Sequence, residues 1–272
     1  RQMCIRDSPW GESVVTDVGQ DKSSRTASVS AEALLDVEQL PYWLSRAVDG
    51  IGGSHRDGQE EMARLVIQAI HDQKHLLVQA GTGTGKSLAY LVPAVLRAAS
   101  GPAPDGDTRT IIATATLALQ RQLIEHDLPR VVSSLNSHLP RDVTYAVLKG
   151  RANFICLEKY NRPVTDATDD GMLFEAPTSR LGKQAKRLRA WVDKTETGDR
   201  DDFPETVDQR LWRSLSVTGR ECVGASKCPF GQECFAERAR QVALASDIVV
   251  TNHAMLAINF DDDIELFPEH EV

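Results

Sequence analysis

The sequence predicts an α/β fold in which a parallel sheet is flanked by helices and interrupted by an inserted, mainly helical domain. Short apolar runs rich in β-branched residues alternate with helical patterns, which is typical of βαβ units. This alternation breaks off over residues 151–240, where four of the five cysteines lie. The composition is that of a folded globular protein, with 41% hydrophobic and 26% charged residues among 272.

The first 48 residues are expected to be a disordered leader and N-terminal extension. Residues 1–30 are rich in Ser, Thr, Asp and Gly and show no sustained periodicity. The opening RQMCIRDSPW, which contains Cys4, lacks the apolar core of a secretory signal and is interpreted as a leader foreign to the fold. A weak helical pattern begins near Ala31.

The α/β pattern is predicted to occupy residues 49–150 and to resume over residues 241–272. Apolar runs of strand length predict strands over 75–79, 110–113, 144–148 and 248–251. Apolar residues three or four positions apart predict helices over 59–71, 86–99 and 117–124. The segment 151–240 is interpreted as an inserted domain.

The strongest motif, AGTGTGKS, follows the first predicted strand and precedes an amphipathic helix. It fits the phosphate-loop pattern, and this strand–loop–helix context disfavours the alternative of a chance Gly-rich turn. Lys86 would bridge the β- and γ-phosphates and Ser87 would bind Mg²⁺, so these two are the expected catalytic residues and ATP and Mg²⁺ the expected cofactors. Backbone N–H groups of the loop and the helix N-terminus would hold the phosphates. The expected binding residues are Ala80, Gly81, Thr82, Gly83, Thr84, Gly85, Lys86 and Ser87.

The cysteines of the insert indicate a metal site. Cys222, Cys228 and Cys234 are spaced C-x5-C-x5-C, and Cys156 lies upstream. Disulfides are not expected in the reducing cytosol, the compartment expected without an export signal. Most zinc sites use C-x2-4-C pairs, whereas an iron–sulfur cluster accepts wider spacing because its corners lie further apart. The spacing favours a cluster and leaves zinc as the alternative.

Two weaker motifs accompany the phosphate loop. Arg56 and Gln59 precede it, and a Gln amide offers the donor and acceptor that match the edge of adenine, although such residues at a helix start are usually only solvated. Thr114, Thr116 and Gln120 follow the second predicted strand, where strand ends face a ligand cleft in open α/β sheets. They are candidates to hold a nucleic-acid phosphate; an ordinary Thr helix cap is the alternative.

The charge is unevenly distributed along the chain. A net charge of −8 argues mildly against a nucleic-acid binder. Residues 180–194 nevertheless contain six basic residues and one acidic residue. With Lys149 and Arg151, this stretch is a candidate surface for single-stranded DNA, although a charge run of this kind is usually a solvated face.

In order, RDGQEEM, AGTGTGKS, TATLALQ, LKGRANFIC, CPFGQECFAERAR and SDIVVTNHAML resemble the motifs of the DinG branch of the XPD/DinG iron–sulfur helicases, within superfamily 2. The resemblance covers about residues 50–272. It implies a RecA-like P-loop NTPase lobe with an inserted cluster domain. It also implies a cytoplasmic, monomeric enzyme without a membrane segment, which uses ATP hydrolysis to unwind single-stranded or forked DNA substrates in repair or replication.

The same resemblance assigns roles to the candidate residues. Arg56 and Gln59 would read the adenine base. Thr114, Thr116 and Gln120 would lie on the single-stranded DNA track. The ligands of a [4Fe–4S] cluster would be Cys156, Cys222, Cys228 and Cys234.

The chain departs from this family in one respect. The Asp-Glu-Ala-His box, whose acids position Mg²⁺ and activate water, does not occur before Val272. The chain is therefore interpreted as a fragment that binds nucleotide without turnover. Asn252 and His253 are assigned no specific chemistry; a helix-cap Asn and a core-facing His are equally expected. The alternative from another class is a non-catalytic nucleic-acid-binding P-loop module with a structural Cys4 metal site.

Overall fold

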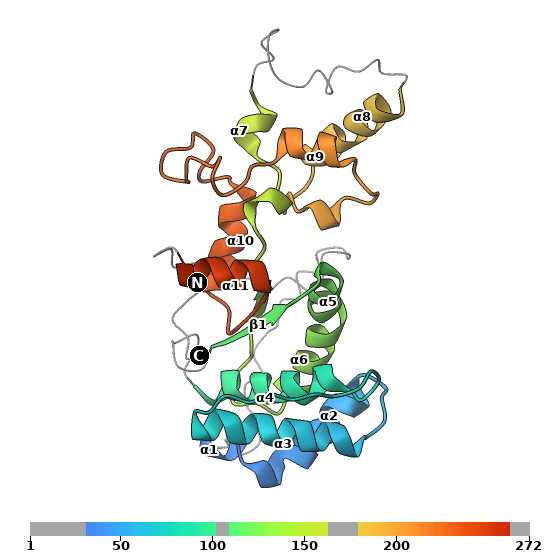
Figure 1. The fold of residues 1–272 in the computed structure, drawn as a ribbon, viewed down its shortest axis with the longest axis vertical. Coiled ribbons are helices and arrows are strands. Elements are labelled where there is room, and N and C mark those ends of the chain that lie inside the picture. The colour runs from blue at the N-terminus through green and yellow to red at the C-terminus, as the bar shows by residue number, and fades with distance from the viewer. Residues whose placement is uncertain (1–30, 102–108, 163–178, 262–272) are drawn as a thin grey trace, which may run out of the picture. The chain divides into compact units, whose positions relative to one another are not determined.

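A computed structural model describes residues 31–101, 109–162 and 179–261 (Figure 1). The chain divides into two compact units. Unit 1 comprises the chain up to Val147 and the return from Ala243, and unit 2 comprises Leu148–Val242. In the part of the chain that the structure describes, no helix combines the length and apolar character needed to cross a membrane.

Unit 1 contains a three-stranded parallel sheet in the order β1-β3-β2. Its strands are β1 (Thr110–Thr114), β2 (Tyr145–Val147) and β3 (Ile248–Asn252). The central strand β3 pairs with both neighbours, and its residues 248–251 are buried, as expected for a strand covered on both faces. The predicted parallel sheet is confirmed. Its central strand is formed by the chain as it returns from unit 2.

Helix α4 (Lys86–Ser100) runs through the core of unit 1 and contacts α1, α2, α3 and α6 (Figure 1). It is apolar on most sides, as expected for a helix with neighbours on most sides. Together with α3 (Asp57–Asp72), it confirms two of the predicted helices. The other helical elements of unit 1 are α1 (Ala31–Leu34), η1 (Val37–Gln39), α2 (Leu40–Gly50), α5 (Leu117–Gln122), the π-helical η3 (Leu123–Asp127), α6 (Leu128–Asn136) and α11 (His253–Asp261).

The later part of the predicted N-terminal extension is folded. Leu34, Leu40 and Leu44 are almost fully buried and belong to the same apolar core as α4. Helix α2 continues across residue 48, so the lobe includes the chain from about residue 31. The prediction of a disordered leader over residues 1–30, with Cys4, lies outside the described residues.

The prediction of a strand at residues 75–79, before the phosphate loop, is wrong for this structure. The segment has no regular secondary structure, and the side chains of Leu76 and Leu77 are 40% and 100% exposed. A strand forms only where a neighbouring strand accepts and donates its backbone hydrogen bonds. None of the described strands pairs with this segment.

Unit 2 has a small apolar core of its own. Phe154, Leu188 and Leu211 are buried in it, and Nε1 of Trp212 donates a hydrogen bond to the carbonyl of Ala152 at 2.7 Å. Its elements are mainly helical: η4 (Arg151–Asn153), α7 (Leu157–Tyr160), α8 (Arg180–Val192), η6 (Arg200–Asp202), α9 (Gln209–Leu215) and all but the last two residues of α10 (Phe235–Leu244).

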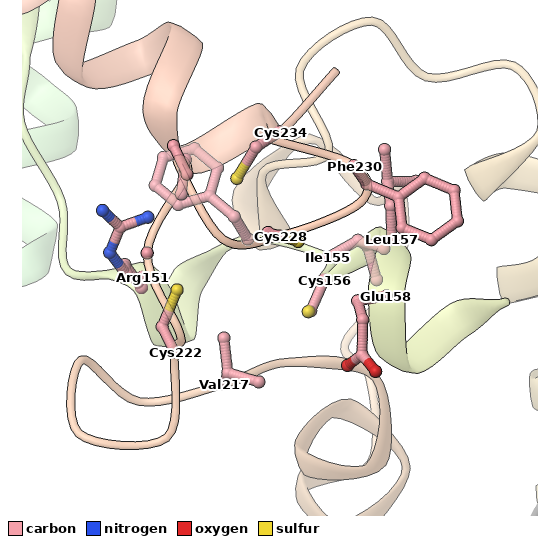
Figure 2. A pocket seen from close by; sticks show the side chains of 14 residues that line it. Arg151, Ile155, Cys156, Leu157, Glu158, Val217, Cys222, Cys228, Phe230 and Cys234 are labelled. Carbon is pink, nitrogen blue, oxygen red and sulfur yellow. The ribbon is translucent and has the colours of Figure 1, made fainter. Parts of the chain in front are cut away.

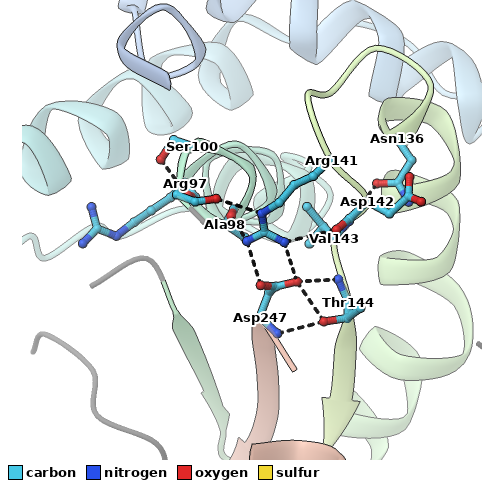
Figure 3. A network of polar contacts seen from close by, with 10 residues as sticks. Arg97, Ala98, Ser100, Asn136, Arg141, Asp142, Val143, Thr144 and Asp247 are labelled. Carbon is cyan, nitrogen blue, oxygen red and sulfur yellow. Dashed lines mark hydrogen bonds and ion pairs between the residues drawn. The ribbon is translucent and has the colours of Figure 1, made fainter. Parts of the chain in front are cut away.

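A polar network holds the start of β3 within unit 1 (Figure 3). Nη1 and Nη2 of Arg141 lie 3.0 and 2.8 Å from the two carboxylate oxygens of Asp247. The same carboxylate accepts hydrogen bonds from the backbone N–H and hydroxyl of Thr144, both at 2.8 Å. Nε of Arg141 donates to the carbonyl of Gly101 at 2.8 Å. The network therefore joins the end of α4, the start of β2 and the start of β3.

Candidate nucleotide loop and four-cysteine site

The phosphate-loop residues form a tight turn that leads directly into α4. Gly83 and Gly85 have φ angles of 79° and 81°, a left-handed backbone that glycine adopts without the steric cost of a Cβ atom. Gly85 is also closely packed, because a Cβ there would lie 2.2 Å from Nε2 of Gln59. The conformation of the loop therefore depends on glycine at these two positions.

Lys86, the first residue of α4, turns its ammonium back over the loop. Its Nζ donates to the carbonyls of Ala80 at 3.1 Å and Gly81 at 2.5 Å. The hydroxyl of Thr84 also donates to the carbonyl of Gly81, at 3.0 Å. Neutral carbonyls are weaker partners for an ammonium than charged phosphate oxygens. The ammonium is therefore placed where phosphate could replace its present acceptors.

Ser87 is hydrogen-bonded to the phenol of Tyr90, three residues further along α4. Burial raises the pKa of Tyr90, and the hydrogen bond from Ser87 opposes that rise. Tyr90 thus helps to orient the hydroxyl that was predicted to bind Mg²⁺. The sequence interpretation did not identify Tyr90; the i, i+3 spacing on a helix is the signal that would have found it.

Arg56 and Gln59, at the start of α3, hold the phosphate loop from outside. Nη1 of Arg56 donates to the carbonyl of Gly83, and Nε2 of Gln59 donates to the carbonyl of Gly85 at 3.0 Å. Gln59 is only 4% exposed, whereas Arg56 is exposed. The structure brings both residues to the loop, and their contact with adenine stays a prediction.

The four cysteines of unit 2 line one cavity (Figure 2). Cys156 immediately precedes α7, and the other three lie on the loop between α9 and α10. All four are half-buried free thiols. Figure 2 shows them around one space, together with apolar side chains that include Val217 and Phe230.

Arg151 lies at the edge of this cavity. Its Nη2 is 3.0 Å from a carboxylate oxygen of Glu237. Burial lowers the pKa of Arg151, but the hydrogen bond to Glu237 and the charges of Cys222 and Cys234 outweigh burial and raise it. The sequence interpretation did not identify Glu237, because no local pattern indicates that it pairs with Arg151, which is 86 residues earlier. The guanidinium therefore supplies positive charge next to two of the thiols.

Opposing effects act on the pKa of the Cys156 thiol. Burial raises the pKa of its thiol, whereas hydrogen bonds from the backbone N–H groups of Lys159 and Glu158 lower it, and the net shift is upward. Its own N–H donates to the carbonyl of Leu215 at 2.7 Å. This bond ties the Cys156 segment to the end of α9, where the loop with the other three cysteines begins.

The donor set fits an iron–sulfur cluster in number and type. In the described part of the chain, no group of three or more His, Cys, Asp or Glu side chains lies close enough to hold a single metal ion. A cluster binds its thiolate ligands through separate irons, so their sulfur atoms lie further apart than those of four thiolates bound to one zinc ion. Four free thiols around one cavity match that donor set, and the cluster itself stays a prediction.

The residues proposed for the DNA track lie at the end of β1 and on α5. Thr116 is exposed, and its hydroxyl accepts a hydrogen bond from the N–H of Leu119 at 3.2 Å, so it is the N-cap of α5. The hydroxyl of Thr114 is buried and donates to the carbonyls of Thr116 and Thr251. Gln120 is 1% exposed, and its Nε2 has no hydrogen-bond partner among the described residues. Their contact with DNA stays a prediction.

Lys149 lies in a buried ion-pair cluster within unit 2. Its Nζ is 2.6 Å from Asp199 and 2.8 Å from Asp201, and its side chain is 10% exposed. Burial lowers the pKa of Lys149, but attraction to Asp199 and the hydrogen bonds to both carboxylates outweigh burial and raise it. The charge of Lys149 is therefore directed into unit 2 rather than toward a ligand at its surface. The sequence did not reveal the two acidic partners, which lie 50 and 52 residues further on.

Helix α8 presents cations to solvent, while Ala185, Leu188 and Val192 on its other side are buried. Arg187 is bound to Glu205, with Nη2 at 2.8 Å from Oε2. The other exposed cations of the helix recur every three residues: Arg180, Lys183, Lys186 and Arg189.

Asn252 and His253 lie where β3 ends and α11 begins. The side-chain oxygen of Asn252 accepts a hydrogen bond from the N–H of Met255 at 2.9 Å, so the helix-cap interpretation is confirmed. His253 is exposed, so the interpretation as a core-facing residue is wrong. His253 is the first residue of α11, and its side chain lies at the solvent-exposed start of that helix.

Comparison with known proteins shows which families the chain is similar to. Residues 60–145 match the family model of the DEAD/DEAH box helicases. This range contains the phosphate loop, α4 and β1. With its parallel sheet and phosphate loop, this part of the chain is similar to part of a DEAD/DEAH box helicase domain.

More specific relatives carry the names DinG and YoaA. The chain is 48% identical to "ATP-dependent helicase DinG" of Mycobacterium tuberculosis (strain ATCC 25618 / H37Rv) over 239 residues, which cover 86% of this chain and 35% of that protein. It is 36% identical to "ATP-dependent DNA helicase YoaA" of Escherichia coli (strain K12), over 84% of this chain and 33% of the relative. It is 33% identical to "3'-5' exonuclease DinG" of Bacillus subtilis (strain 168), over 80% of this chain and 22% of the relative. The predicted resemblance to DinG-type helicases is confirmed, and the chain spans about a third or less of the length of these relatives.

Proposed function

We propose that the chain supplies most of the first motor lobe of an ATP-dependent DNA helicase of DinG type. The observation that carries this proposal is the phosphate loop, with Lys86 held over it at the start of a buried helix. The loop lies within the segment that matches the DEAD/DEAH box helicases. The whole protein would couple ATP hydrolysis to the separation of DNA strands in repair or replication, acting on single-stranded or forked DNA.

The proposed nucleotide chemistry follows from groups already in place. Backbone N–H groups of the loop and of the first turn of α4 would hold the phosphate oxygens. Lys86 would exchange its two carbonyl partners for the β- and γ-phosphates, and Ser87 would bind Mg²⁺. Bound Mg²⁺ neutralises phosphate charge. Arg56 and Gln59, which donate hydrogen bonds to the loop from the start of α3, would also read the adenine base.

Unit 2 is proposed to hold a [4Fe–4S] cluster on Cys156, Cys222, Cys228 and Cys234. The bound cluster would supply a crosslink between the segment before α7 and the loop before α10. Arg151 would offset part of the negative charge of the four thiolates. The exposed cations of α8 are proposed to contact the phosphates of single-stranded DNA.

Calorimetric titration of the chain with ATP and Mg²⁺ tests the nucleotide proposal. We expect saturable, Mg²⁺-dependent binding. Lys86→Ala should weaken it roughly 10- to 100-fold, because a hydrogen bond to a charged group contributes about 1.5–3 kcal/mol. Lys74→Ala is the matched control, because Lys74 is exposed and pairs only with Asp72 in the described residues. Equal affinities of the parent and Lys86→Ala would exclude the proposed role of the loop.

A further inference from the structure

A short turn between α8 and η6 contacts two of the cysteine-bearing segments of unit 2. Gly198, which is buried in this turn, has a φ angle of 58°. Its N–H donates a hydrogen bond to the hydroxyl of Thr195 at 3.0 Å. The carboxylate of the next residue, Asp199, lies 2.6 Å from the buried ammonium of Lys149. The turn is therefore anchored on both sides of Gly198.

The backbone of Gly198 holds the segment that leads to Cys156. Its carbonyl accepts a hydrogen bond from the N–H of Ile155 at 2.9 Å. The next residue of the turn, Asp199, forms an isolated antiparallel bridge with Phe154. Because Ile155 directly precedes Cys156, these backbone contacts fix the position from which the Cys156 side chain extends.

The same glycine packs against the start of α10. A Cβ at Gly198 would lie 2.4 Å from Cδ2 of Phe235, so the ring occupies the space that a side chain would need. Phe235 directly follows Cys234 and is buried in the apolar core of unit 2. The guanidinium of Arg238 lies 5.0 Å from the centroid of this ring and donates to the carbonyl of Glu196 at 3.1 Å. The first turn of α10 is thus held against the turn that contains Gly198.

Two thiols of the four-cysteine site therefore depend on one residue for their spacing. Cys156 and Cys234 both line the cavity, although they come from segments that are far apart in the sequence. Protein interiors are closely packed, so an added methyl group without free space displaces its neighbours. Because the ring of Phe235 is buried in the core, a Cβ at Gly198 would push the start of α10 away from the turn.

We propose that Gly198 is a positioning residue of the four-cysteine site, which sets the distance between the Cys156 segment and the start of α10. A side chain at position 198 separates these two segments and with them Cys156 and Cys234. The placement of the segments requires no bound cluster. Its consequence, that a chain without Gly198 retains less iron, rests on the proposed function.

Amide hydrogen exchange of the metal-free chain, followed by NMR spectroscopy, tests the placement directly. In Gly198→Ala, the N–H of Ile155 should exchange several times faster than in the parent, because its acceptor is displaced. The N–H of Leu188, within α8 in the core of unit 2, should keep its rate, which separates local opening from loss of the fold. Gly52→Ala is the matched control, because Gly52 has a φ angle of 67° with nothing within 4 Å of the added Cβ. An unchanged rate at Ile155, or equal rises at Ile155 and Leu188, would overturn the proposal.

A second substitution tests whether the contact with the ring is the cause. Phe235→Ala removes the atoms that a Cβ at Gly198 would meet. Substitutions of residues in contact have non-additive effects. Gly198→Ala should therefore speed exchange at Ile155 several times less in the Phe235→Ala background than in the parent. The same acceleration in both backgrounds would show that packing on Phe235 does not set the spacing.

The iron content of anaerobically purified chain gives a second readout. Gly198→Ala should retain several-fold less iron per chain than the parent, whereas Gly52→Ala should retain as much as the parent. Equal iron in Gly198→Ala and the parent would contradict the positioning role. Absence of iron from the parent would instead contradict the proposed cluster, and the exchange rate of Ile155 would still decide the role of Gly198.

Discussion

Arg141 and Asp247 form a two-pronged ion pair although they are 106 residues apart in the sequence. The carboxylate of Asp247 is 3% exposed and the guanidinium side chain of Arg141 is 18% exposed. Asp247 immediately precedes β3, the strand formed by the chain as it returns from unit 2. The pair therefore fixes the point at which the insert rejoins the sheet.

Asp247→Ala should destabilise unit 1 by about 3 kcal/mol, because it leaves a largely buried guanidinium without its counter-charge. The free energy of unfolding, from urea titration, measures the effect. Glu205→Ala is the control, since it removes the partner of Arg187 in an exposed ion pair of unit 2 and should change stability little. Equal losses in the two variants would contradict the role given to the buried pair.

Much of unit 1 could be predicted because its signals are local. Runs of β-branched residues predicted β1 and β3. The helical spacing of apolar residues predicted α3 and α4. Both signals lie within a few consecutive residues. The segment 75–79 has the same apolar signal but no strand, because a strand also needs a partner, which an apolar pattern does not specify.

For the candidate sites, the sequence indicated which residues take part but not which contacts they make. The phosphate loop and the four cysteines follow from spacing, and the structure brings each set together. The placement of Lys149 could not be predicted, because its partners Asp199 and Asp201 are distant in sequence and look like ordinary surface acids. Burial and pairing of a charge are properties of tertiary packing.

Gly85→Ala should impair the phosphate loop more than its φ angle alone explains. The added Cβ would lie 2.2 Å from Nε2 of Gln59, so that side chain must move and its hydrogen bond to the carbonyl of Gly85 is disturbed. Gly52→Ala is a matched control, because Gly52 has a φ angle of 67° with nothing within 4 Å of the added Cβ. Each change should cost about 1–2 kcal/mol of stability from the left-handed backbone, and only Gly85→Ala should also weaken ATP binding. Unchanged ATP affinity in Gly85→Ala would contradict the packing of the loop on Gln59.

Unit 2 should lose stability at high pH through Tyr160. Burial, together with a 2.7 Å hydrogen bond to Asp193, raises the pKa of Tyr160 from 10.0 to about 12. The folded state therefore keeps a proton that the unfolded chain releases, and this contribution is complete below pH 10 and disappears as the pH rises from 10 to about 12. Urea unfolding across that range should show a steeper decline for the parent than for Tyr160→Phe. Parallel declines would exclude this linkage.

The exposed cations of α8 should govern the salt dependence of single-stranded DNA binding. Replacing Lys183, Lys186 and Arg189 with Gln should weaken binding for all base sequences. It should lower the slope of log affinity against log salt by about 2, since each phosphate contact on a single strand contributes about 0.7. Arg187→Gln should have a smaller effect, because Glu205 already pairs with that guanidinium. Fluorescence anisotropy with labelled oligonucleotides over a range of salt gives the slope, and an unchanged slope in the triple variant would exclude α8 as a DNA surface.

Metal analysis of anaerobically purified chain tests the central claim most directly, because it decides what the four cysteines hold. The account predicts about four irons per chain and a broad absorbance near ~400 nm, as expected for a thiolate-bound iron–sulfur cluster. Cys222→Ser should remove both signals, whereas Cys4→Ser should leave both intact. One zinc ion per chain with no iron would contradict the account and identify unit 2 as a structural zinc domain.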